Sequence, residues 1–134
     1  MIYVVMSAQE WPTIHGALAT CGFHWSSTII WAKEALVISR KDYHTQYEPL
    51  WYGWRGDAPR VAPLEDRKQS DLWNIARPDF RHSQYDHPTT KPVELIERAL
   101  LNSSKPGAIV FEPFSGSGST IIACEKAGRK ARAI

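Results

Sequence analysis

The 134-residue sequence is poor in three features, and each absence excludes a class of protein. It has only two cysteines, Cys21 and Cys124, which lie far apart and lack the spacing of metal ligands, so neither a disulfide framework nor a metal site is predicted. Its net charge of +2 is too small to indicate nucleic-acid binding by itself. No apolar run approaches the length of a membrane span, and no signal peptide is recognisable. We therefore expect a cytoplasmic protein with no membrane partner.

The strongest motif lies near the end of the sequence. Residues 108–111 are an apolar run of strand-forming type that ends in the carboxylate of Glu112. A glycine-rich turn follows, and residues 121–127 are predicted to form a helix that ends at Gly128. This order of strand, glycine loop and helix is typical of a nucleotide-cofactor site. Glycine lets the backbone pass close to a ligand, and the first turn of a helix offers N–H groups to an anion.

The spacing within the loop argues against two common nucleotide sites. A phosphate-binding P-loop needs a lysine after its last glycine, but Gly118 is followed by Ser119. A dinucleotide site needs a third glycine three residues after the second, and Ile121 stands there. The alternative without a ligand is a turn whose glycines serve tight packing alone.

A second motif, His-Pro-Thr-Thr-Lys-Pro, occupies residues 87–92. It leads into a predicted helix in which Pro92 suits the first turn and the preceding threonines are able to cap. Val93, Ile96 and Leu100 share one face of this helix, so we expect it to pack on a sheet.

In this order, the two motifs resemble those of the DNA methyltransferases that modify adenine N6 or cytosine N4 with S-adenosylmethionine. The resemblance covers nearly the whole chain and implies an α/β fold, a partial Rossmann-like methyltransferase sheet with an antiparallel edge hairpin. It also implies double-stranded DNA as the substrate. The cofactor-binding residues that it implies are His87, Thr89, Thr90, Lys91, Glu112, Pro113, Phe114, Gly116, Gly118, Ser119 and Thr120.

The resemblance also implies roles for these residues. Glu112 would bind the ammonium of the methionine end, and the two glycines would admit the cofactor. Ser119 and Thr120 would present the start of the helix, while Thr89, Thr90 and Lys91 would flank the methionine carboxylate. The ring of Phe114 would line the pocket.

The rest of the chain predicts one incomplete methyltransferase domain with three parts. Residues 1–54 should form a strand, a helix and an antiparallel hairpin, followed by a long variable loop at 55–86 and the cofactor-binding half at 87–134. We expect His15 to be structural rather than a ligand, Pro49 to need an edge or bulge position, and Trp73 to be an anchor.

The catalytic tetrapeptide of the resembling enzymes, Asp/Asn/Ser-Pro-Pro followed by an aromatic residue, is missing, because the sequence contains no Pro-Pro pair. We therefore name no catalytic residue and expect the chain to be an inactive fragment whose catalytic segment precedes Met1. The alternative is a non-catalytic remnant that acts as a binding or dimerising module. In the family, the strand leading to that tetrapeptide separates the strand at 108–112 from the strand at 1–6. These two strands should therefore either pair or leave open edges, which would favour a homodimer.

Overall fold

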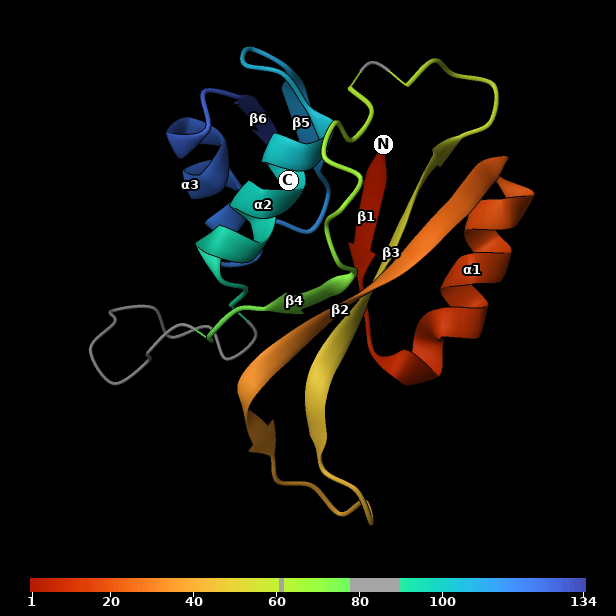
Figure 1. The fold of residues 1–134 in the computed structure, drawn as a ribbon, viewed down its shortest axis with the longest axis vertical. Helices are drawn as coiled ribbons and strands as arrows, with labels where there is room; N and C mark the ends of the chain where they lie inside the picture. The colour runs from red at the N-terminus through yellow and green to blue at the C-terminus, as the bar shows by residue number, and fades with distance from the viewer. Residues whose placement is uncertain (61, 78–89) are drawn as a thin grey trace. The chain divides into compact units, whose positions relative to one another are not determined.

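The computed structural model describes residues 1–60, 62–77 and 90–134. The chain divides into two compact units (Figure 1). Unit 1 comprises residues 1–61 and 66–75, and unit 2 comprises residues 62–65 and 76–134. Among the helices described, none is both long and apolar enough to cross a membrane.

Unit 1 is built on a four-stranded sheet. Its strands are β1 (Ile2–Val5), β2 (Phe23–Val37), β3 (Thr45–Arg55) and β4 (Leu72–Asn74), in the spatial order β1-β3-β2-β4. β2 and β3 form the predicted antiparallel hairpin, β1 is antiparallel to β3, and the short β4 is parallel to β2. The strands and the hairpin predicted for residues 1–54 are therefore confirmed.

The prediction that Pro49 lies at an edge or a bulge was wrong, because β3 is an interior strand and Pro49 lies opposite Ile30 of β2 in regular register. On its other side, the ladder with β1 ends at the pair Val5–Leu50. The Met6 N–H still donates to the Pro49 carbonyl at 3.2 Å, but proline has no N–H with which to complete the pair. An interior strand therefore tolerates proline here because its neighbour ends at this point.

Buried tryptophans form the core of unit 1. Trp31, Trp51 and Trp73 are at most 3% exposed. Their indole N–H groups donate to the Ile75 carbonyl at 2.7 Å, to Nδ1 of His15 at 3.2 Å and to the Ser70 carbonyl at 3.2 Å, respectively. A buried indole needs such a partner, so these bonds accompany the burial. The anchoring role predicted for Trp73 is confirmed.

Helix α1 (Trp11–Thr20) follows the short turn η1 (Ala8–Glu10) and contacts β2. The ring of His15 stacks on Trp11 with centroids 4.6 Å apart and accepts the bond from Trp51. These contacts confirm that His15 is a structural residue. Gly22 follows the helix with a φ of 79°, a conformation that suits glycine at a helix end.

Unit 2 contains helices α2 (Val93–Ser103) and α3 (Ser119–Lys126) and the parallel strands β5 (Ile109–Glu112) and β6 (Lys130–Ala133). The predicted apolar face of α2 packs chiefly against α3, and Val110 of β5 and Ala131 of β6 join the same core, so the expectation of packing on a sheet was incomplete. The shared core consists of Leu100, Ala123 and Cys124 with Val93, Ile96, Val110, Ala127 and Ala131 around them.

The strands β1 and β5 belong to different sheets. Within the described residues, β1 is hydrogen-bonded only to β3, and β5 only to β6. Of the two arrangements predicted for these strands, the structure therefore has the one that leaves open edges.

Candidate functional site

The site lies in unit 2, where β5 passes through the glycine loop into α3. Gly116 and Gly118 have φ values of 51° and 78°, and Gly118 is the N-cap of α3. A Cβ atom added at either position would meet no atom closer than 3.9 Å. Tight packing therefore does not account for these glycines. Glycine is required by the left-handed backbone, which turns the chain at the end of the sheet.

The carboxylate of Glu112, at the end of β5, is held from two sides. Its Oε1 accepts the Phe114 N–H at 2.9 Å, and its Oε2 accepts the Thr120 hydroxyl at 3.1 Å. A carboxylate has about four lone-pair sites, so these two bonds orient Glu112 and leave acceptor capacity for a ligand cation.

The start of α3 offers donors to an anion. The backbone N–H groups of Ser119 and Thr120 have no acceptor among the residues that the structure describes, although both residues are at most 7% exposed. Such N–H groups in the first turn carry the positive end of the helix dipole. A ligand with an ammonium and a carboxylate close together therefore finds a partner for each charge between Glu112 and the helix start.

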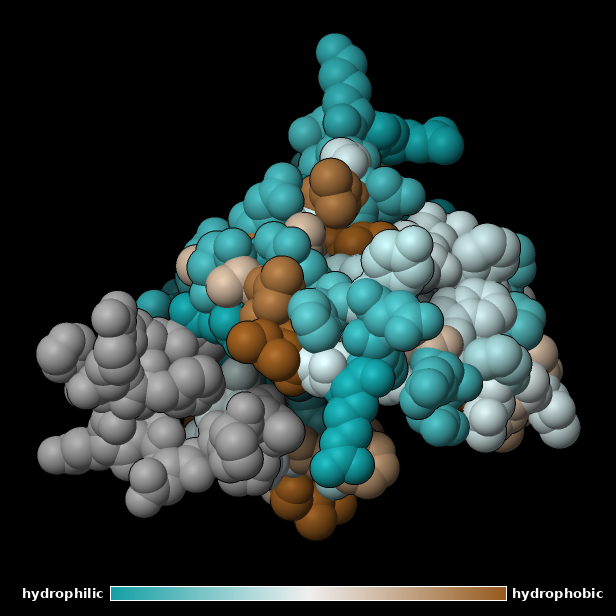
Figure 2. Space-filling model, turned by 90° about the horizontal axis from the view of Figure 1, so that it is seen from below, coloured by the Kyte–Doolittle hydropathy of each residue, from teal (hydrophilic) through white to brown (hydrophobic). Residues whose placement is uncertain are grey.

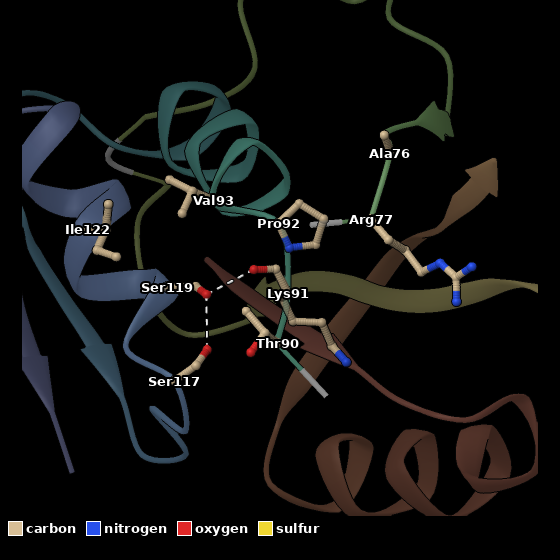
Figure 3. A pocket seen from close by; sticks show the side chains of 9 residues that line it. All are labelled: Ala76, Arg77, Thr90, Lys91, Pro92, Val93, Ser117, Ser119 and Ile122. Carbon is tan, nitrogen blue, oxygen red and sulfur yellow. Dashed lines mark hydrogen bonds between the residues drawn. The ribbon is translucent and has the colours of Figure 1, made fainter. Parts of the chain in front are cut away.

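Hydrogen bonds join the two sequence motifs. Ser119 Oγ donates to the Lys91 carbonyl at 2.8 Å and lies 3.2 Å from Ser117 Oγ (Figure 3). Helix α2 begins two residues after Lys91, with Pro92 as its N-cap and no side-chain cap, so the capping expected of the threonines is not seen at the N-cap. Two predicted site residues, His87 and Thr89, lie outside the described residues.

A pocket of about 230 Å³ opens beside this junction. Its walls come from residues 76–77, residues 90–93, Ser117 of the glycine loop, and Ser119 and Ile122 of α3 (Figure 3). The volume is below the roughly 300–1,000 Å³ of complete ligand pockets, so it suits one end of a cofactor.

The predicted site residues therefore divide into two groups around this pocket. Thr90, Lys91 and Ser119 line it, whereas the other described members of the set lie outside its walls. The ring of Phe114, expected in the pocket wall, is 88% exposed. The members outside the walls are Glu112, Pro113, Phe114, Gly116, Gly118 and Thr120.

Sequence reasoning did not name several residues that line the pocket. Arg77 lies in the predicted variable loop at 55–86 and Ile122 in the predicted helix at 121–127, and neither was proposed as a site residue. Ser117 stands between the two glycines, and that position could have marked it as a site residue. No cluster of histidine, cysteine or acidic side chains suited to a metal ion occurs in the described ranges.

Comparison with known proteins identifies the relatives of this chain. The family model described as DNA methylase, of the N6/N4 type, matches residues 1–134. The DNA adenine methyltransferase YhdJ of Escherichia coli (strain K12) is 30% identical over 158 residues, which include 96% of this chain and 53% of that protein. The type II methyltransferase M.Cfr9I of Citrobacter freundii is 30% identical over 125 residues, 85% of this chain and 41% of that protein. The chain thus spans about half the length of these relatives.

Solved structures agree on the fold. The complex of M1.HpyAVI with SAM superimposes with a TM-score of 0.82 at 23% identity, over 98% of this chain and 66% of that one. The cytosine-N4-specific PvuII DNA methyltransferase superimposes with a TM-score of 0.77 at 18% identity, over 95% of this chain and 52% of that one. The predicted α/β methyltransferase fold is confirmed. The chain belongs to the N6/N4 DNA methylase family.

Proposed function

We propose that this chain is the S-adenosylmethionine-binding part of a cytoplasmic DNA methyltransferase that acts on adenine N6 or cytosine N4 in double-stranded DNA. The observation that carries this proposal is that the Glu112 carboxylate is hydrogen-bonded to the Thr120 hydroxyl at the start of α3, where the N–H groups of Ser119 and Thr120 have no acceptor among the described residues. The methionine end of the cofactor has an ammonium and a carboxylate, and these two groups match the Glu112 carboxylate and those N–H groups, respectively. When bound, the cofactor supplies a methyl group activated by its sulfonium.

The proposal assigns a part to each of the main site residues. Glu112 accepts a hydrogen bond from the ammonium while Thr120 keeps its carboxylate in position. The N–H groups of Ser119 and Thr120 donate to the carboxylate, with Thr90 and Lys91 beside them. Gly116 and Gly118 keep side chains away from the ligand. The names of the relatives include both adenine and cytosine-N4 enzymes, so both target bases stay within the proposal.

Calorimetric titration with S-adenosylmethionine tests the cofactor site. We expect Gly118→Val to abolish binding, because valine strains the loop at a φ of 78° and adds bulk beside the ligand. Gly107→Val is the matched control, since Gly107 has a φ of 81° and open space around it but lies outside the loop. Equal binding by Gly118→Val and the parent would show that the loop is not the site.

We also propose that these 134 residues bind the cofactor without methylating DNA by themselves. Methyl transfer needs the amino nitrogen held in line with the methyl group, and no Pro-Pro-aromatic segment is present to hold it. The measurement is tritiated methyl incorporation into mixed-sequence duplex DNA, with and without a polypeptide that carries such a segment. Robust incorporation by the chain alone contradicts the proposal.

The second candidate function is a non-catalytic module that binds a partner chain. The observation that favours it is the pair of open strand edges on β1 and β5, since such edges take up strands from other chains. The strand taken up would come from a second copy or from a separate methyltransferase segment. This candidate would be favoured if no methyl group were incorporated even after that segment is added and light scattering gave the mass of a dimer.

A further inference from the structure

The pocket of unit 2 carries positive charge. All the residues that line it belong to this unit, and two of them, Arg77 and Lys91, are cations. None of the described residues in its walls is acidic, and the other polar side chains there are the hydroxyls of Thr90, Ser117 and Ser119. Hydroxyl groups have no net charge, so the two cations dominate the charge of the walls.

The two cations come from separate segments of the chain. Arg77 lies three residues after β4 and Lys91 two residues before α2, and both are half-buried. Their side chains extend to the same side of the pocket, across from Ser117 and Ser119 (Figure 3). Ser119 begins α3, so the positive end of a helix dipole faces the pocket from that side. Both sides of the pocket therefore favour an anion between them.

The pocket is small enough for both cations to act on a group that occupies it. A compact cavity of about 230 Å³ is about 6 Å across, less than the Debye length of about 8 Å at physiological salt. By contrast, hydrophilic side chains on the face shown in Figure 2 project into open solvent, where water weakens their interactions. A charged ligand group inside the pocket therefore interacts with Arg77 and Lys91 without needing a hydrogen bond to either.

We propose that Arg77 is a specificity-determining residue of the cofactor site, whose charge, together with that of Lys91, selects ligands with a carboxylate at the methionine end. This inference rests on the proposed function, which makes S-adenosylmethionine the ligand. Glu112, the partner proposed for the ammonium, lies outside the walls of the pocket. A ligand without the carboxylate loses the attraction of the two cations and keeps an ammonium that they repel.

Calorimetric titration of the whole chain with S-adenosylmethionine and with decarboxylated S-adenosylmethionine measures this selection. The two ligands share the sulfonium and the ammonium and differ in the carboxylate, so the ratio of their affinities reports the contribution of the carboxylate. We expect Arg77→Gln to reduce this ratio about threefold or more, because unit charges about 6 Å apart change an affinity about threefold even at the dielectric constant of water. The affinity for the decarboxylated ligand should not fall.

Further measurements separate charge from packing. Arg77→Lys keeps the cation but not the shape of the guanidinium, so the affinity ratio should stay close to that of the parent. Arg98→Gln is the matched control, because it removes a cation from a half-buried site on α2 outside the pocket walls and should leave the ratio unchanged. In the parent, the ratio should fall as salt is raised to 1 M, where the Debye length is about 3 Å.

Several outcomes would overturn the inference. They are an unchanged ratio in Arg77→Gln, an equal loss of affinity for both ligands in that variant, a ratio in Arg77→Lys as low as in Arg77→Gln, and a ratio in the parent that does not depend on salt.

The same titrations distinguish a failure of this inference from a failure of the proposed function. If the parent binds S-adenosylmethionine and Gly118→Val does not, the proposed function stands even where Arg77→Gln leaves the ratio unchanged. A parent that binds no S-adenosylmethionine contradicts the proposed function and, with it, the role of Arg77.

Discussion

The two units are stabilised in different ways. Unit 1 buries the large side chains of Trp31, Trp51 and Trp73, each with its indole N–H bonded. The shared core of unit 2 is built largely from smaller side chains, with Ala123 and Cys124 almost fully buried. Burial of large apolar area stabilises the first unit. In the second, hydrogen bonds at the C-terminal ends of the two helices add to this smaller core.

Arg129 shows how unit 2 is held. Its guanidinium donates to Ser104 Oγ at 3.0 Å, to the Ser104 carbonyl at 2.6 Å and to the Ala127 carbonyl. Ser104 follows the last turn of α2 and Ala127 follows the last turn of α3, so one cation satisfies carbonyl groups at the ends of both helices. Removing a large side chain from unit 1 and this cation from unit 2 therefore tests the comparison directly.

The largest effect is expected in unit 1, from Trp31→Ala. The change leaves a cavity and an unbonded Ile75 carbonyl, and we expect the free energy of unfolding to fall by about 3–5 kcal/mol. The measurement is equilibrium denaturation in urea. Trp25→Ala is the matched control, because Trp25 is 42% exposed and should cost less than half as much. Equal losses for the two variants would mean that burial in this core does not determine stability.

A smaller effect is expected in unit 2, from Arg129→Ala, which should cost about 1.5–3 kcal/mol because charged hydrogen bonds are lost. The local readout is alkylation of Cys124, which is 1% exposed and whose thiol pKa is raised by burial. If unit 2 opens more easily, alkylation should accelerate about tenfold or more, while that of the exposed Cys21 stays unchanged.

Electrostatics alone would have the opposite effect on Cys124. The charge of Arg129 lowers the pKa of this thiol, so its removal would raise the pKa and slow the reaction. Faster alkylation of Cys124 in Arg129→Ala would therefore report the opening of unit 2 and not a change in the thiol pKa. Arg132→Ala, at an exposed site on β6, is the control. An unchanged rate for Cys124 in Arg129→Ala would contradict the role given to this cation.

The smallest effect concerns an exposed ion pair of unit 1. The hydrogen bond from Arg55 lowers the pKa of Asp57 below its ordinary value. A lowered folded-state pKa contributes stability above the ordinary Asp pKa of about 3.9, and this is lost as the pH falls through the folded-state value. The difference in stability between the parent and Asp57→Asn should therefore shrink only at acid pH, and added salt should reduce it further. If the stability difference between the parent and Asp57→Asn grew at acid pH, the prediction would be contradicted.

The sequence by itself determined the local elements and the family of this protein. Alternating and continuous apolar runs specify strands, and the pair of motifs at 87–92 and 112–120 specifies the family, because both signals depend on residues that are near neighbours in the chain. The left-handed glycines of the loop were predictable for the same reason.

Only the tertiary structure decided which distant groups meet. It placed the Ser119 hydroxyl on the Lys91 carbonyl, 28 residues away, and the Trp31 indole on the Ile75 carbonyl, 44 residues away. It also placed Pro49 inside the sheet, where the end of β1 makes proline acceptable. Such placements depend on strand order and helix packing, which arise from many weak contacts between segments far apart in sequence, and no local pattern records them.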